Sequence, residues 1–181
     1  MSVQVIYESM FGNTHVVAAA VTEGLRDGLR TRGLDVPVHL TDVSQAPWEL
    51  PGDTTLVVLG GPTHAFSMSR PSTRADALQQ THEHDAARAG IGIREWIDRS
   101  SASATMTVVT FDTRVKKRFV PGSAAKSAAK ALTEDGFDHV ERGETFWVAD
   151  TPGPLLDGEA DRARAWGVEL AARVPGAAPA S

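Results

Sequence analysis

The sequence of 181 residues predicts an α/β fold, in which strands and helices alternate along one domain. Three observations predict it. A short β-branched run opens the chain, a tight turn follows, and a helical stripe of apolar residues comes next. Further strand and helix patterns then alternate without an internal repeat or a clear linker. We expect the domain to span residues 1–174, with a Pro/Ala-rich tail over residues 175–181.

The first half of the chain holds three strand patterns and one helix pattern. Val3–Tyr7 is the first strand, and the helix after it carries an apolar residue every fourth position and ends near Gly33. The second strand, Asp35–Leu40, contains a proline and therefore belongs at or near a sheet edge. Residues 41–53 predict no more than a rudimentary helix. Leu56–Leu59, the most hydrophobic run, predicts a central strand buried on both faces.

The second half begins with a polar connection whose length is typical of a functional loop. Ile93, Trp96 and Ile97 mark the next helix, and Thr105–Phe111 is the fourth strand. The segment Asp112–Gly122 reads as a loop. Ser123 caps a helix that runs to about Asp135. The fifth strand includes Glu144–Val148, and the last helix covers about Asp157 to Val174.

Composition excludes several classes of function. The chain carries 18 Lys and Arg against 23 Asp and Glu, so its net charge of −5 makes it a poor general binder of nucleic acid. It has no cysteine, which excludes disulfides, thiolate catalysis and cysteine-ligated metals. We find neither an apolar run long enough to span a membrane nor a secretory signal at the N-terminus. We therefore expect a cytoplasmic protein.

Three loops follow the carboxyl ends of the first, third and fourth strands, where open parallel sheets bind ligands. The first loop has the properties of a phosphate cradle, because Gly12 allows close backbone approach and Ser9, Asn13 and Thr14 offer short polar side chains. It matches neither the Walker loop nor the G-x-G-x-x-G turn. The alternative is an ordinary Asn/Thr helix cap.

The run from Ser9 to Thr14, Ser-Met-Phe-Gly-Asn-Thr, resembles the FMN phosphate loop of flavodoxins and of flavodoxin-like modules in larger flavoproteins. Gly60-Gly61-Pro62-Thr63-His64 stands where that family has its first ring-binding loop. The resemblance implies a three-layer α/β/α sandwich of the short-chain type. Its sheet would have five parallel strands in the order 2-1-3-4-5.

The resemblance also implies a cofactor, FMN, and the residues that would bind it. The phosphate would contact residues of the first loop, namely Ser9, Met10, Phe11, Gly12, Asn13 and Thr14. The flavin ring would lie between two walls and contact Pro62, Thr63, His64, Phe66, Phe111, Asp112, Thr113 and Arg114.

The sequence departs from the family pattern in both parts of the site. Met10 and Phe11 stand where many flavodoxins have hydroxyls, so fewer side-chain bonds would hold the phosphate. No Tyr or Trp lies in the ring-side loops, which leaves His64 or Phe66 to stack on the flavin. The alternative for Phe66 is a loop anchor packed on the core.

The ring-side loops are rich in cations, in contrast to the acidic surroundings of flavin in low-potential flavodoxins. The basic residues are Arg70, Arg74, Arg114, Lys116, Lys117 and Arg118. If they face the flavin, we expect it to be easier to reduce than in electron-carrier flavodoxins. Two alternatives remain open: the side chains extend into water, or they bind an anionic partner or a nucleotide phosphate.

Two other patterns predict no chemistry. The segment His82-Glu83-His84-Asp85 places its histidines two residues apart, which does not match the helical spacing of zinc ligands, so we interpret it as a solvated polar stretch and expect no metal. Ser67, Ser69 and Ser72 are not framed by a G-x-S-x-G elbow, which argues against a hydrolase.

The sequence therefore predicts an FMN-binding redox protein that exchanges electrons or hydride with a partner protein, a small quinone or NAD(P)H. If it is an enzyme, it is an FMN-dependent oxidoreductase, and the flavin rather than a catalytic side chain performs the chemistry. Two alternatives remain: a pure electron carrier, and a flavodoxin-fold binding module that has weakened or lost FMN.

Overall fold

The structure, a computed structural model, describes residues 1–64, 66–81, 90–101, 106–116 and 122–176. Its centre is an all-parallel sheet of five strands in the order β2-β1-β3-β4-β5, which confirms the predicted topology. The strands, in chain order, are β1 Ser2–Tyr7, β2 Val38–Asp42, β3 Thr54–Pro62, β4 Thr107–Val115 and β5 His139–Val148.

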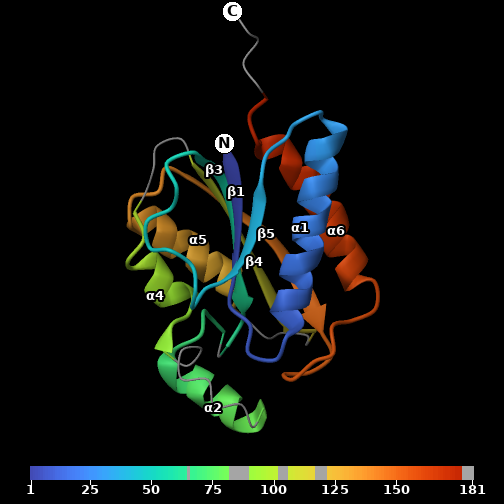
Figure 1. Cartoon of the computed structure of the whole chain (residues 1–181). Helices are drawn as coiled ribbons and strands as arrows, with labels where there is room; N and C mark the ends of the chain where they lie inside the picture. The colour runs from blue at the N-terminus through green and yellow to red at the C-terminus, as the bar shows by residue number, and fades with distance from the viewer. Residues whose placement is uncertain (65, 82–89, 102–105, 117–121, 177–181) are drawn as a thin grey trace, which may run out of the picture.

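Helices cover both faces of this sheet (Figure 1). The bounds are α1 Asn13–Thr31, α2 Pro71–Thr81, α4 Ile93–Ile97, α5 Ala124–Glu134 and α6 Glu159–Leu170, with a 3₁₀ turn at Ala171–Arg173. The long helices α1 and α6 pack on one face, and α4 and α5 pack on the other. Helix α2 lies beyond the edge toward which the strands point. Among the described helices, none is sufficiently long and apolar to cross a membrane.

Two elements differ from the prediction. β2 begins at Val38 rather than at Asp35, because Pro37 has no amide proton to donate and contributes only its carbonyl, which accepts a hydrogen bond from the Val3 amide at 2.9 Å. Pro71 stands at the first position of α2, a helix that the sequence analysis missed. The helix was missed because few of its residues are apolar; of these, Ala77 and Leu78 are buried.

The fourth strand is longer than predicted and continues through Asp112 to Val115, where a loop was expected. Its last residues pair with both neighbouring strands, since Thr113 faces Pro62 of β3 and Phe146 of β5. Alternation along the extended strand therefore decides where Phe111, Asp112, Thr113 and Arg114 point.

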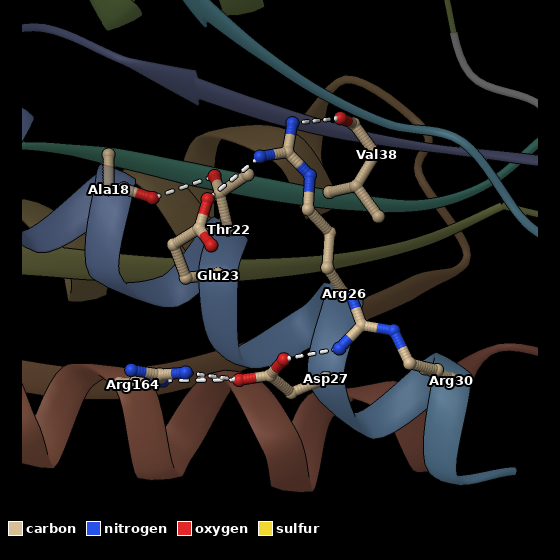
Figure 2. A network of polar contacts seen from close by, with 8 residues as sticks. All are labelled: Ala18, Thr22, Glu23, Arg26, Asp27, Arg30, Val38 and Arg164. Atoms are coloured by element: carbon tan, nitrogen blue, oxygen red, sulfur yellow. Dashed lines mark hydrogen bonds and ion pairs between the residues drawn. The ribbon is translucent and has the colours of Figure 1, made fainter.

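Glycines allow α1 and α6 to approach each other closely. A Cβ atom on Gly24 would lie 2.0 Å from the carbonyl oxygen of Arg164, and one on Gly167 would lie 2.3 Å from that of Val21. At the rim of this contact the Arg164 guanidinium donates to Asp27, which also pairs with Arg30 (Figure 2). Backbone contact between the helices therefore fixes one face of the sandwich, and an exposed ion-pair network borders it.

We expect Gly24→Ala to destabilise the protein by about 1–3 kcal/mol, because the added methyl group forces the two backbones apart. Urea unfolding followed by circular dichroism measures the change. Gly52→Ala is the matched control, because no atom lies within 4 Å of its added Cβ atom. An equal loss in both variants would contradict the close-packing argument.

Candidate functional site

The candidate site is an open cavity of about 200 Å³ beyond the carboxyl ends of β1, β3 and β4. Its lining includes ten of the predicted site residues: Ser9, Met10, Phe11, Asn13, Thr14, Pro62, Thr63, His64, Thr113 and Arg114. It also includes four residues that the sequence analysis did not name: Thr73, Val115, Val148 and Thr151. Gly12, Phe66, Phe111 and Asp112 are not part of the lining.

The first turn of α1 faces this cavity, and its N-cap residue has no side chain to bind the first amides. Its N-cap is Gly12, which adopts φ 84°, a left-handed conformation that favours glycine. The amide of His15 donates to Ser9 Oγ at 3.3 Å. Thr14 Oγ1 lies 2.8 Å from Thr113 Oγ1, so a hydroxyl pair joins the first loop to the end of β4. The positive end of the helix dipole and three polar side chains thus meet at one end of the cavity.

The N-terminus of α5 differs, because the chain supplies its own anion. The carboxylate of Asp112, fully buried, accepts hydrogen bonds from Ser123 Oγ at 2.6 Å, Thr63 Oγ1 at 2.8 Å and the Ala125 amide at 3.2 Å. Its second oxygen accepts from Thr145 Oγ1 at 2.7 Å. The Ser123 hydroxyl in turn accepts a hydrogen bond from the Lys126 amide, and the Thr63 hydroxyl accepts one from the Ala124 amide. Three first-turn amides of α5 are therefore bound to Asp112, either directly or through a hydroxyl.

Asp112 and Phe111 were expected in the wall of the ring site, and the structure places both in the interior instead. The continued alternation of β4 directs Asp112 toward α5 and Phe111 toward α6. The Phe111 ring packs against Phe146 and Trp166 with centroid separations of 6.1 Å. The adjacent Thr113 and Arg114 reach the cavity. Asp112 thus acts on the site by holding Thr63 in place.

The apolar residues of the first loop have a structural reason. Met10 is buried against Ala77 and Leu78 of α2, and Phe11 packs on the same small cluster. This contact attaches α2 to the first loop and brings Thr73 to the cavity. Met10 and Phe11, which stand where many flavodoxins have hydroxyl side chains, therefore pack against α2 in this protein.

The loop after β5 closes the remaining side of the cavity. Asn13 Nδ2 donates to the carbonyl of Pro152 at 3.2 Å, and Thr151 lines the cavity nearby. A Cβ atom on Gly153 would lie 2.6 Å from Asn13 Oδ1, so this loop fits closely over the start of α1. The position of this loop could have been predicted from the sequence. A fifth parallel strand ends at the same edge of the sheet as the other four, so the loop after it lies at that edge.

Phe66 lies outside the cavity, at the tip of a tight turn, and 57% of it is exposed. Two backbone hydrogen bonds between His64 and Ser67 close the turn. Phe66 itself adopts φ 72°, which is strained for an aromatic residue. The packing of Gly122 on its backbone holds this conformation, since a Cβ atom there would lie 2.1 Å from the Phe66 carbonyl oxygen. Stacking of Phe66 on a ligand stays a prediction.

Arg74 is fully buried, so of the alternatives left open for the ring-side cations, extension into water does not apply to this residue. Its guanidinium pairs with Glu95 at 3.0 Å and donates to Ser69 Oγ at 2.8 Å and to the Gly90 carbonyl at 3.2 Å. The same pocket holds the side chain of Glu8, whose Oε2 accepts the Ile93 amide at 3.0 Å. This cluster anchors α2 and the preceding loop to the body of the fold.

Burial is the largest cause of the pKa shifts of Glu8, which belongs to this cluster, and of His64. Desolvation raises the pKa of Glu8, and the Ser69 hydroxyl, the Ile93 amide and Arg74 offset it only in part. Desolvation together with the Arg74 charge lowers the pKa of His64. His64, which lines the cavity, is therefore a neutral donor and acceptor at pH 7.

Two other predictions cannot be placed. His82, Glu83, His84 and Asp85 lie outside the described residues, as do Lys117 and Arg118. Within the described ranges, Ser67 bonds Ser127 and Ser69 bonds Arg74, so both hydroxyls serve the structure of the loop.

Solved flavodoxins share this architecture. An archaeal flavodoxin superposes with a TM-score of 0.60 at 16% identity, over 96% of this chain and 98% of its own. A flavodoxin from Streptococcus pneumoniae TIGR4 gives 0.59 at 14% identity, over 96% and 100%. The rubredoxin oxygen:oxidoreductase of Desulfovibrio gigas gives 0.55 at 18% identity, over 95% of this chain but 35% of that larger one.

Neither a protein-family model nor a curated protein matches the sequence. The similarity to solved structures, at these identities, shows the fold. The chain has the flavodoxin fold: a five-stranded parallel sheet of order 2-1-3-4-5 between layers of helices.

We expect Asp112→Asn to destabilise the fold by on the order of 3 kcal/mol. The NH₂ group of asparagine is a donor, and it would face buried groups that now donate to the carboxylate. Thermal and urea unfolding measure the loss. Asp138→Asn, at an exposed position, makes the same chemical change as a control. If the two variants unfold alike, Asp112 does not organise the end of β4.

We expect Glu8→Gln to change the pH dependence of stability. Because folding raises the pKa of Glu8, the folded state holds its proton more tightly than the unfolded chain does. The wild-type carboxyl therefore contributes stability below its ordinary pKa of 4.5, and this contribution is lost as the pH rises through the raised value. Glutamine has no such loss.

The measurement is the free energy of unfolding of both proteins between pH 4.5 and pH 8. The variant should gain relative to the wild type as the pH rises. A constant difference across the range, or a relative gain by the wild type, would contradict the assignment of Glu8 as a buried group with a raised pKa.

Proposed function

We propose that this protein binds FMN without a covalent bond and works as a redox protein. The observation that carries the proposal is the start of α1, where the N-cap Gly12 offers no side chain and the first turn faces a cavity lined by Ser9, Asn13 and Thr14. A phosphate dianion fits that position because it accepts several N–H and O–H donors and offsets the helix dipole. The helices that follow β4 and β5 also begin at this edge: Asp112 already binds the start of α5, and α6 carries the acidic residues Glu159 and Asp161 in its own first turn.

The size of the cavity agrees with a cofactor that is partly exposed. About 200 Å³ is less than the ordinary volume of a site that encloses a small molecule. The phosphate and its chain would fill the part beside α1, and the ring would lie toward Pro62, Thr63, His64 and Arg114. A flavin held this way supplies one-electron or hydride transfer, and its exposed edge is open to a reaction partner.

The residues of this chain have separate roles in the proposal. Ser9, Asn13 and Thr14 bind the phosphate, and the pair of Thr14 with Thr113 fixes the distance between the phosphate end and the β4 wall. Neutral His64 offers one donor and one acceptor to the ring. Asp112 is a positioning residue, since it holds Thr63 but does not line the cavity.

A second candidate, a flavodoxin-fold binding module without FMN, is favoured by one observation. Of the described aromatic residues, Phe11 and His64 line the cavity, and no tyrosine or tryptophan does. This alternative predicts that the purified protein stays colourless and does not quench the fluorescence of added FMN.

The first test is titration of the purified protein with FMN, followed by quenching of flavin fluorescence and by absorption in the blue and near-ultraviolet. We expect Asn13→Ala and Thr14→Ala each to weaken FMN binding about tenfold or more, since each removes a hydrogen bond to a charged group. Thr31→Ala, on the last turn of the same helix, is the matched control and should bind like the wild type.

Titration with riboflavin, which lacks the phosphate, separates binding of the phosphate from binding of the flavin ring. The wild type should bind it more weakly than FMN, and Asn13→Ala and Thr14→Ala should bind it as the wild type does. Unchanged FMN affinity in both variants would show that the phosphate lies elsewhere. Absence of any FMN binding by the wild type would favour the second candidate.

A further inference from the structure

The charges of this chain are segregated along the sequence. Residues 54–75 and 113–133 together carry eight of the 18 Lys and Arg residues and none of the 23 Asp and Glu residues. The rest of the chain has ten basic residues against all 23 acidic ones, so an acidic protein contains two purely basic stretches. Such a distribution produces a local positive potential that the net charge of −5 conceals.

The fold brings the described parts of the two basic stretches together beside the cavity, which His64 and Arg114 line. They contain the carboxyl ends of β3 and β4, which are adjacent and parallel. Ser67 Oγ donates to Ser127 Oγ at 3.0 Å, which joins the ring-side turn to the first turns of α5 beside Lys126. Arg114 Nη1 donates to the carbonyl of Gly122 at 2.5 Å. We refer to Arg70, Arg114, Lys116 and Lys126 as the basic mouth.

Carboxylates offset only part of this charge. Arg74 is buried against Glu95 and beside Glu8, so it is excluded from the basic mouth. The charge of Lys116 helps to lower the pKa of Glu159. The carboxylate of Glu159 therefore offsets part of the positive charge of Lys116. Asp112 is enclosed by hydroxyls and amides. Arg70 and Lys126 are exposed: Arg70 follows the His64–Ser67 turn in the chain, and Lys126 is next to Ser127, which bonds Ser67 of that turn.

Phe66 adds an apolar element to the same surface. It is the most exposed large apolar side chain of the described residues, and the turn that carries it is held by the His64–Ser67 backbone bonds and by Gly122. A strained backbone persists only where the surrounding structure maintains it, and such residues concentrate at functional sites. A rigid exposed aromatic residue among cations has the composition of a protein interface anchor.

We propose that the basic mouth and Phe66 form the docking surface for an acidic redox protein, which exchanges electrons with the cofactor through the open edge of the cavity. This inference rests on the proposed function for the electron exchange, but the surface itself does not require FMN. Basic side chains steer an acidic partner to this edge of the protein, and Phe66 enters an apolar site on that partner.

A protein suits this surface better than the phosphates of a dinucleotide. A phosphate clamp uses convergent arginine forks, whereas Arg74 is engaged with Ser69 and Glu95. Arg114 donates to the Gly122 carbonyl and stacks on Trp147 at 5.2 Å from the ring centroid. The exposed charges belong to separate elements, since Arg70 directly precedes α2 and Lys126 lies in α5.

The kinetic test uses the FMN-loaded protein, reduced with dithionite, and follows its oxidation by two small probes at several salt concentrations. Ferricyanide is an anion and hexaammineruthenium(III) is a cation. We expect the ferricyanide rate to fall as salt is added and the ruthenium rate to rise, because the local potential is positive. Arg70→Glu and Lys126→Glu should each slow ferricyanide about threefold or more at low salt, and the double variant about tenfold.

Arg30→Glu is the matched control for overall charge. It lies in the last turn of α1, about 25 Å from the start of that helix by the helical rise, and pairs with Asp27 (Figure 2). It should leave both rates within about twofold. An equal slowing by Arg30→Glu and Arg70→Glu, or a faster ruthenium reaction at low salt, would overturn the proposal.

The binding test needs no flavin. A ¹⁵N-labelled protein is titrated with a peptide that has glutamates on both sides of a central Trp-Leu pair, and with the same peptide carrying lysines instead. We expect the acidic peptide alone to shift amides of residues 63–70 and 122–127, and Phe66→Ala and Lys126→Glu to weaken its binding about threefold or more.

The outcomes separate the two proposals. A protein that binds this peptide but not FMN would support the surface and refute the proposed function. Shifts elsewhere, or equal binding of the lysine peptide, would overturn the surface. If NADPH shifts these amides and the acidic peptide does not, the surface takes a dinucleotide instead, and the proposal is overturned.

Discussion

The carboxylate of Asp112 is the interaction on which the cavity end of this fold depends. It is fully buried, and its four hydrogen bonds come from three elements: one from the end of β3, two from the start of α5 and one from β5. A buried carboxylate is costly unless donors surround it, so its neighbours have little freedom to move. Because Thr63 is one of those neighbours, the wall of the cavity inherits this rigidity.

The same interaction distinguishes two helix N-termini that point to one edge of the sheet. In α5 the protein supplies the anion, and the amides of Ala124, Ala125 and Lys126 are bound within the chain. In α1 the N-cap is Gly12, which has no side chain to offer. In the proposed function this difference gives the cavity a direction: the phosphate would lie beside α1, and the rest of the ligand would extend toward β3 and β4.

Burial separates the cations of the ring-side loops into two groups with different effects. Arg74 joins Glu8, Ser69 and Glu95 in a closed cluster that holds α2 against the sheet. Its charge reaches the cavity through its effect on His64, whose pKa it helps to lower. Arg70 and Lys126 face solvent instead and set the potential seen by an approaching partner. One basic composition therefore serves both stability and recognition.

The sequence by itself determined the fold class, the order of the five strands along the chain and the location of the first loop, because these depend on local periodicity and on turn residues such as Gly12 and Gly33. Ser123 was likewise found as a helix cap, since a cap is a local signal. Only the tertiary structure decided which side chains reach the cavity. Phe111 and Asp112 point inward because β4 continues past the expected end, and Arg74 is buried with distant carboxylates from the loop after β1 and from α4. Those outcomes depend on contacts between residues far apart in the chain, which local patterns do not encode.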